Sequence, residues 1–117
     1  PAPPAPVPIF VGGHSELAFR RAARIGDGWL GIHYTPQDLI ANCALLQQAR
    51  EDAGTADRRF EVLASPLAAP STDLVEELEA AGVTTIITSA WMSSGIEAPP
   101  VEQAEELIAS YGERFIR

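Results

Sequence analysis

Lysine is absent from this 117-residue chain, and cysteine occurs only once. Arginine supplies all 8 basic residues against 16 acidic ones, which leaves a net charge of −8. A nucleic-acid partner is excluded, because neutralising its phosphates needs a basic face that this balance cannot supply. The single cysteine, Cys43, has no partner for an internal disulfide, which agrees with a reducing compartment.

Long apolar runs and a targeting segment are also missing. Apolar runs such as Val83 to Ile87 are far shorter than the roughly 20 residues that cross a membrane. No charged segment followed by an apolar one marks a secretory signal. Cysteine and histidine show no metal-ligand spacing. We therefore expect a cytoplasmic protein with no membrane partner and no metal site.

The composition that remains is that of an ordinary folded domain. Hydrophobic residues make up 46% of the chain and charged residues 21%, and the length fits one domain or a piece of one. We expect a proline-rich leader over residues 1–6 and a folded domain over residues 7–117. Because the chain begins with Pro1 and not with Met, we expect further coding sequence before it.

Apolar strand patterns alternate with helical ones along the whole chain. Strands are predicted over residues 7–11, 28–34, 60–64 and 83–89, and helices after each of them, over residues 15–25, 36–53, 71–81 and 100–115. This order indicates an α/β fold of four βα units with a parallel sheet. Four units can form a small open sheet or half of an eight-stranded barrel, and the pattern alone does not separate the two.

Capping residues set the helix boundaries. Ser15 and Thr35 are N-cap candidates, and Pro36 follows at the first helical position, where its missing N–H costs nothing. Gly26 and Gly82 end the first and third helices. Apolar residues recur at helical spacing in the first helix at Leu17, Ala18, Ala22 and Ile25, and in the last helix at Ala104, Ile108, Tyr111 and Phe115.

Three segments resemble one known family. Pro8-Ile-Phe-Val-Gly-Gly-His-Ser15 is followed by Ala18-Phe-Arg-Arg-Ala-Ala-Arg-Ile-Gly-Asp-Gly-Trp29, and Ala80-Ala-Gly-Val-Thr-Thr-Ile-Ile87 comes later. In this order they resemble the bacterial luciferase-like monooxygenase family. The resemblance is to its actinobacterial branch, which uses the deazaflavin coenzyme F420, and it covers almost the whole chain.

The resemblance implies a fold and an activity. Members are (β/α)8 TIM barrels, and this chain matches their units five to eight, the C-terminal half. The implied protein is an F420-dependent or, alternatively, FMN-dependent oxidoreductase that transfers a hydride to or from a small molecule. Its catalytic residues would lie on the N-terminal half, so the isolated chain is expected to be inactive.

A half-barrel leaves two strand edges without partners, which predicts a second half. This partner would be the N-terminal half of the same barrel or a second copy in a homodimer. The alternative function is a non-catalytic half-barrel module that associates with itself and binds at most an anion.

One turn has the features of an anion site. Gly12, Gly13, His14 and Ser15 lie between a strand and the N-terminus of a helix, where exposed backbone N–H groups and the helix dipole favour negative charge. The resemblance implies that this turn holds the cofactor phosphate. The alternative interpretation is that two glycines merely form a tight turn between strand and helix.

Five further residues are candidates for a pocket, because they lie at or just after strand ends, where barrel active sites assemble. They are His33, Tyr34, Ser65, Ser89 and Trp91. Each has a structural alternative, since such residues often serve packing alone. Asp27 and Trp29 match the family motif, and we expect them to order a turn and to pack the start of a strand.

Overall fold

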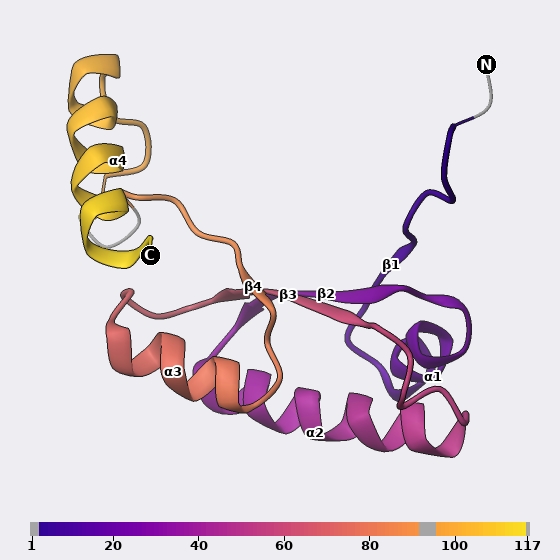
Figure 1. Ribbon diagram of the computed structural model, residues 1–117. Helices are drawn as coiled ribbons and strands as arrows, with labels where there is room; N and C mark the ends of the chain where they lie inside the picture. The colour runs from indigo at the N-terminus through magenta and orange to yellow at the C-terminus, as the bar shows by residue number, and fades with distance from the viewer. Residues whose placement is uncertain (1–2, 92–95, 117) are drawn as a thin grey trace.

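The computed structural model describes residues 3–91 and 96–116, and within them strands and helices alternate (Figure 1). The strands lie in one parallel sheet in the order β1-β2-β3-β4. The elements are β1 (Phe10–Gly12), α1 (Glu16–Ile25), β2 (Gly28–Tyr34), α2 (Pro36–Asp52), β3 (Glu61–Pro66), α3 (Thr72–Ala80), β4 (Thr85–Ile86) and α4 (Val101–Phe115). The predicted α/β fold of four βα units is therefore confirmed.

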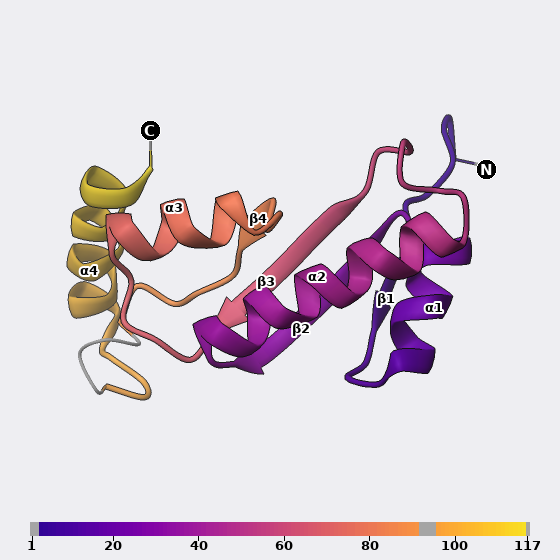
Figure 2. The ribbon, with the colours of Figure 1, turned by 90° about the horizontal axis from the view of Figure 1, so that it is seen from below.

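Helices α1, α2 and α3 cover one face of the sheet (Figures 1 and 2). The core between them is built around four side chains that are almost completely buried: Trp29, Leu39, Leu46 and Leu78. Among the described residues, no helix covers the opposite face, where Phe10, Ile32 and Ile87 remain 40%, 39% and 41% exposed. A closed barrel fills this face with side chains from all its strands, so the sheet has the form of a barrel wall whose interior is open.

The predicted helix starts are confirmed by side-chain capping bonds. The hydroxyl oxygens of Ser15, Thr35 and Ser71 each accept a hydrogen bond from the backbone N–H three residues later. At the end of α3, Gly82 has a φ of 101°, a conformation that glycine adopts without strain. Local sequence therefore fixes where these helices begin and end.

The two edge strands are shorter than predicted. β1 covers Phe10–Gly12 instead of residues 7–11, and β4 covers Thr85–Ile86 instead of residues 83–89. Each edge strand pairs with a neighbour on one side only and along part of it, β1 with Gly28–Leu30 and β4 with Leu63–Ala64. The third strand shows the opposite difference, because it runs on to Pro66 and so includes Ser65.

Helix α1 does not bury the side that carries its large aliphatic residues. Leu17 and Ile25 are 64% and 61% exposed. The core contacts come from Ala18, Phe19, Ala22 and Ala23. Small alanines allow the helix to approach the sheet closely, so its bulkier aliphatic side chains lie on the outside.

Helix α4 has no buried residue and stands apart from the layer of α1, α2 and α3 (Figure 1). Its predicted apolar stripe is only partly covered: Tyr111 and Phe115 border a hollow next to β4 and α3, whereas Ile108 is 55% exposed. The preceding segment, residues 92–95, lies outside the described part of the chain. The layer of helices that covers the sheet is therefore incomplete beside β4.

Cys43 lies on the buried side of α2. Burial raises the pKa of its thiol, which keeps it protonated and unreactive. Within residues 3–91 and 96–116, no three histidine, cysteine or acidic side chains gather closely enough to hold a metal ion. No helix in the same part of the chain is long and apolar enough to span a membrane.

Leu39 and Leu45 provide a matched test of this core, because both lie on α2 but only Leu39 is fully buried, while Leu45 is 57% exposed. We expect Leu39→Ala to lower the free energy of unfolding by about 2–5 kcal/mol, since it leaves a cavity. Leu45→Ala should change it by less than about 0.5 kcal/mol. Urea unfolding followed by circular dichroism measures both values, and equal losses would contradict the described burial.

Candidate functional site

The candidate turn joins the C-terminal end of β1 to the first turn of α1. Ser15 caps the helix, and its Oγ lies 3.3 Å from the N–H of Ala18. Gly13 has a φ of 121°, which a residue with a Cβ rarely adopts. A Cβ at Gly13 would also lie 2.8 Å from the Cβ of Ala18, so the turn packs tightly against the helix that follows it. Both features require glycine at position 13.

The turn is open to solvent at Gly12. A Cβ built there meets no atom within 4 Å, and the residue is exposed. Within the described residues, the backbone N–H groups of His14 and Ser15 make no hydrogen bond. These two donors stand at the positive end of the α1 dipole, which is the arrangement that binds phosphate in other proteins. The residues present therefore fit a phosphate group.

The indole of Trp29 fixes this turn from the neighbouring strand. Its Nε1–H donates a hydrogen bond of 3.0 Å to the carbonyl oxygen of Gly13. Trp29 is fully buried, and the edge of the Phe19 ring packs against it with 5.4 Å between ring centroids. Trp29 therefore does more than the predicted packing of a strand start, because it also holds the carbonyl of the turn in place.

A second contact to the turn comes from Tyr34 at the end of β2. Its hydroxyl is hydrogen-bonded to Nδ1 of His14, and the two rings lie 4.9 Å apart. Burial raises the pKa of Tyr34, and the negative charge of Asp38 acts in the same direction, whereas a hydrogen bond from Asn42 opposes them. The hydroxyl therefore keeps its proton and can donate it to Nδ1, which would leave the His14 Nε2–H as a donor toward a ligand.

Tyr34 reaches His14 because of a bulge in β2. The pairing with β3 shifts between Ile32 and Tyr34, and His33 between them has a φ of 62°. Strict alternation would place Tyr34 on the same face as Leu30 and Ile32. The extra residue turns it to the face of Trp29, whose ring lies 6.0 Å away. The sequence does not mark this bulge, because a positive φ is expected at glycine and the bulge residue is a histidine.

The remaining candidates lie along the same edge of the sheet but do not join the turn. Ser65 is half-buried and pairs in register with Ile32, so it lies on the uncovered face. Ser89 and Trp91 follow β4, and β2 and β3 lie between that strand and the turn. His33 is exposed. The structure thus brings only Tyr34 of these five residues into contact with the turn.

Asp27 has the structural position that its motif predicts. Its Oδ2 accepts a hydrogen bond of 2.9 Å from the backbone N–H of Ile9, and Arg58 lies 3.9 Å from its other oxygen. These contacts tie the segment before β1 to the turn between α1 and β2, at the end of the sheet opposite the candidate site. Asp27 therefore orders the N-terminal ends of the strands.

Comparison with known sequences gives relatives without an assigned activity. The chain is 42% identical over 87 residues to uncharacterized proteins of Mycobacterium tuberculosis and Mycobacterium bovis. The match covers 74% of this chain but 30% of each relative, so the chain spans less than a third of the proteins it matches. No family model matches the chain.

Comparison of structures identifies the fold. The chain is similar to the coenzyme F420-dependent tetrahydromethanopterin reductase of Methanopyrus kandleri, with a TM-score of 0.62 and 15% sequence identity. The match covers 87% of this chain and 49% of the reductase chain. The fold is therefore similar to that of about half of the reductase chain and is of the TIM-barrel type, as the sequence predicts.

Substitutions at the two adjacent glycines test the rigidity of the turn. We expect Gly13→Ala to lower the free energy of unfolding by about 1–3 kcal/mol, because it combines an unfavourable φ with a close contact to Ala18. Gly12→Ala should change it by less than about 0.5 kcal/mol, since the added methyl meets only open space. Chemical unfolding of both variants checks this, and the reverse order would contradict the described turn.

Tyr34→Phe tests the burial of the Tyr34 hydroxyl beside the turn through the pH dependence of stability. The folded chain raises the pKa of Tyr34 above its ordinary value of 10.0, so folded protein holds this proton more tightly than unfolded protein does. Any stability advantage of the wild type over Tyr34→Phe should be complete below about pH 10 and should shrink as the pH rises further. Urea unfolding at a series of pH values measures it, with Tyr111→Phe as a control. An advantage that grows above pH 10 would refute the assignment.

Proposed function

We propose that this chain forms the phosphate-binding half of a luciferase-like oxidoreductase that uses coenzyme F420. The observation that carries the proposal is the turn from Gly12 to Ser15. It combines open space, two unbonded backbone donors and a helix N-terminus in a chain with the fold of an F420-dependent reductase. The sequence resemblance supports the same cofactor over FMN.

In this proposal the residues of the turn bind and orient the phosphate. The N–H groups of His14 and Ser15 donate to its oxygens, and Gly12 allows the group to approach the backbone. His14, held by Tyr34, adds its Nε2–H as a further donor. Glu16 stands next to the turn, and its carboxylate is paired with Arg20, which offsets its repulsion of an anion. The deazaflavin supplies the hydride chemistry when it is bound.

The other rim residues would contribute to the substrate pocket. His33, Ser65, Ser89 and Trp91 lie at or after the C-terminal ends of β2, β3 and β4, where parallel strands of a barrel present their functional side chains. A small molecule beside the cofactor ring would lie above this edge. The groups that complete the reaction would come from the other half of the barrel, so the half-barrel alone binds but does not turn over.

Cofactor titrations with a Gly12→Val variant test this function. We expect the chain to bind F420 more tightly than FMN in a fluorescence titration. Gly12→Val should weaken F420 binding roughly ten-fold or more, because it blocks the backbone donors from the phosphate. A deazaflavin analogue without the phosphate should bind the wild type and the variant equally.

Gly112→Ala is the matched control, since its Cβ would lie in the described part of α4 at 3.9 Å from Ile116, remote from the turn. It should leave F420 binding unchanged. Equal F420 affinities of the wild type and Gly12→Val would overturn the assignment of the turn. Tighter binding of FMN would overturn the choice of cofactor while leaving the phosphate site intact.

A further inference from the structure

We infer that Ser65 determines the class of substrate at this rim: an uncharged molecule with an apolar body and one oxygen, a hydroxyl or a carbonyl, that bonds to the Ser65 hydroxyl. The inference rests on the proposed function, in which this end of the sheet borders the substrate. It concerns β2 and β3, the two strands that have a neighbour on each side within the chain. This part of the rim therefore does not depend on the two edges of the sheet.

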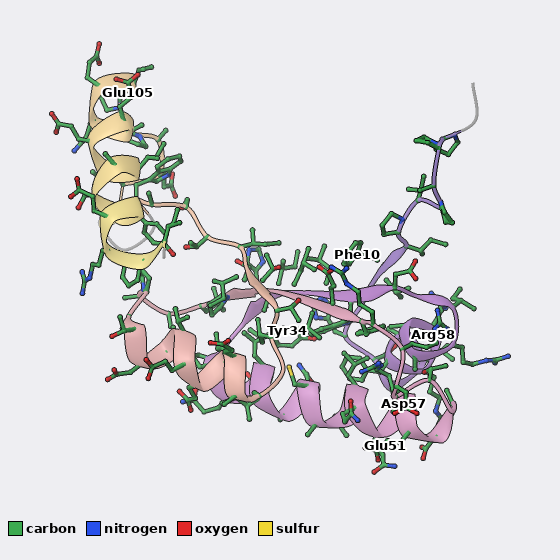
Figure 3. All side chains as sticks on the ribbon, in the orientation of Figure 1. Phe10, Tyr34, Glu51, Asp57, Arg58 and Glu105 are labelled. Atoms are coloured by element: carbon green, nitrogen blue, oxygen red, sulfur yellow. The ribbon has the colours of Figure 1, made fainter. Side chains whose placement is uncertain are left out.

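Ser65 lies on the face of the sheet opposite the helices. Figure 3 shows Phe10 on this face, on the side away from α1, α2 and α3. Phe10 pairs in register with Gly28, and Ile32 follows Gly28 by an even number of residues, so it lies on the same face. Ser65 is the partner of Ile32 in β3. The Ser65 side chain therefore lies on the side that a closed barrel encloses.

Along its own strand, Ser65 lies between two leucines on this face. Alternation places Leu63 and Leu67, two residues before and two residues after it, on the same side. The backbone N–H of Leu67 donates a hydrogen bond of 2.7 Å to the carbonyl oxygen of Tyr34, so the pairing with β2 continues past Pro66. Leu67 is 56% exposed. It therefore stands at the edge of the rim, where a ligand can reach it.

Isoleucines flank Ser65 on the two neighbouring strands. Ile32 lies beside it on β2. Ile87 lies beside it just after β4, where its backbone N–H donates a hydrogen bond of 2.7 Å to the carbonyl oxygen of Ala64. Both isoleucines are partly exposed, at 39% and 41%. Ser65 therefore occupies the centre of an aliphatic wall, which consists of Ile32, Leu63, Leu67 and Ile87.

The hydroxyl of Ser65 makes no hydrogen bond within residues 3–91 and 96–116, and its oxygen is not fully buried. A ligand that covers this hydroxyl removes its water, so binding is favoured only when the ligand supplies a new partner. The oxygen of a hydroxyl or a carbonyl group supplies one, because a serine hydroxyl both donates and accepts. A hydrocarbon would leave the hydroxyl unsatisfied, so the wall discriminates against it.

Charged groups on this face are remote from the aliphatic wall. On the described strands β2, β3 and β4, Glu61 carries the only carboxylate or guanidinium group. It lies four residues before Ser65 along β3, a distance of about 13 Å along the strand. Its carboxylate is paired with Arg59 at 2.6 Å. An ion against the wall would lose its hydration without gaining an opposite charge, so these strands favour an uncharged ligand.

Titrations of the 117-residue chain with small molecules, followed by heteronuclear NMR, test this inference. Cyclohexanone is the probe, because it is an uncharged ring with one carbonyl oxygen. It should shift the amide signals of Ser65, Leu67 and Ile32 and leave those of α4 unchanged. Methylenecyclohexane, in which a methylene group replaces the oxygen, and cyclohexanecarboxylate, which carries a charge, should each bind about five-fold more weakly or less.

Variants at Ser65 separate the hydroxyl from the apolar surface around it. Ser65→Ala should weaken the binding of cyclohexanone about three- to ten-fold, because the carbonyl loses its donor. It should leave the binding of methylenecyclohexane unchanged. Ser65→Thr keeps a hydroxyl and should restore the affinity for cyclohexanone. Ser110→Ala on the exposed surface of α4 is the matched control and should change neither affinity.

Equal affinities of the wild type and Ser65→Ala for cyclohexanone would overturn the role of Ser65. Binding of cyclohexanecarboxylate as tight as that of the ketone, or no binding of the ketone at the aliphatic wall, would overturn the assigned substrate class. These titrations contain no cofactor, so a failure of the proposed function is distinguishable. It would appear as F420 binding that does not depend on Gly12, while the selectivity at Ser65 persists.

Discussion

The hydrogen bond from the Trp29 indole to the carbonyl of Gly13 is the constraint on which the candidate site depends. A buried indole N–H needs an acceptor, and here the acceptor belongs to the turn itself. Gly31 makes this possible, because a Cβ there would lie 2.2 Å from the Trp29 ring. The ring can therefore lie along β2 toward the turn. Trp29 thus belongs both to the core and to the candidate site, and a change in the packing of its ring would move the carbonyl group of Gly13.

The fold was predictable wherever its signals are local. Ser15, Thr35 and Ser71 cap their helices with their own hydroxyls, and a glycine ends α3, so these boundaries need no knowledge of the rest of the chain. The edge strands were not predictable to the same degree. β1 and β4 pair with only part of β2 and β3, and how much of each edge segment joins the sheet is a property of the folded sheet and not of the segment alone.

The site was predictable as a turn but not as a set of contacts. The glycines and the N-cap serine mark the turn from Gly12 to Ser15 in the sequence alone. The bond between Tyr34 and His14 depends on a bulge at His33, and a one-residue change of alternation moves a side chain to the other face of a sheet. Reading such a bulge from sequence would require the register with β3, which only the folded sheet defines.

In the proposed function, an acidic chain without lysine would bind a phosphate by other means than a cluster of cations. The exposed arginines of α1 line a hollow that this helix shares with α2, and one of them, Arg20, is paired with Glu16. The donors at the turn are backbone N–H groups, whose strength depends on their orientation and on the helix dipole. At the proposed site, affinity would be governed by the rigidity that Gly13, Trp29 and Tyr34 provide. It should therefore depend less on salt concentration than binding by exposed arginines would, because screening acts most strongly between exposed charges.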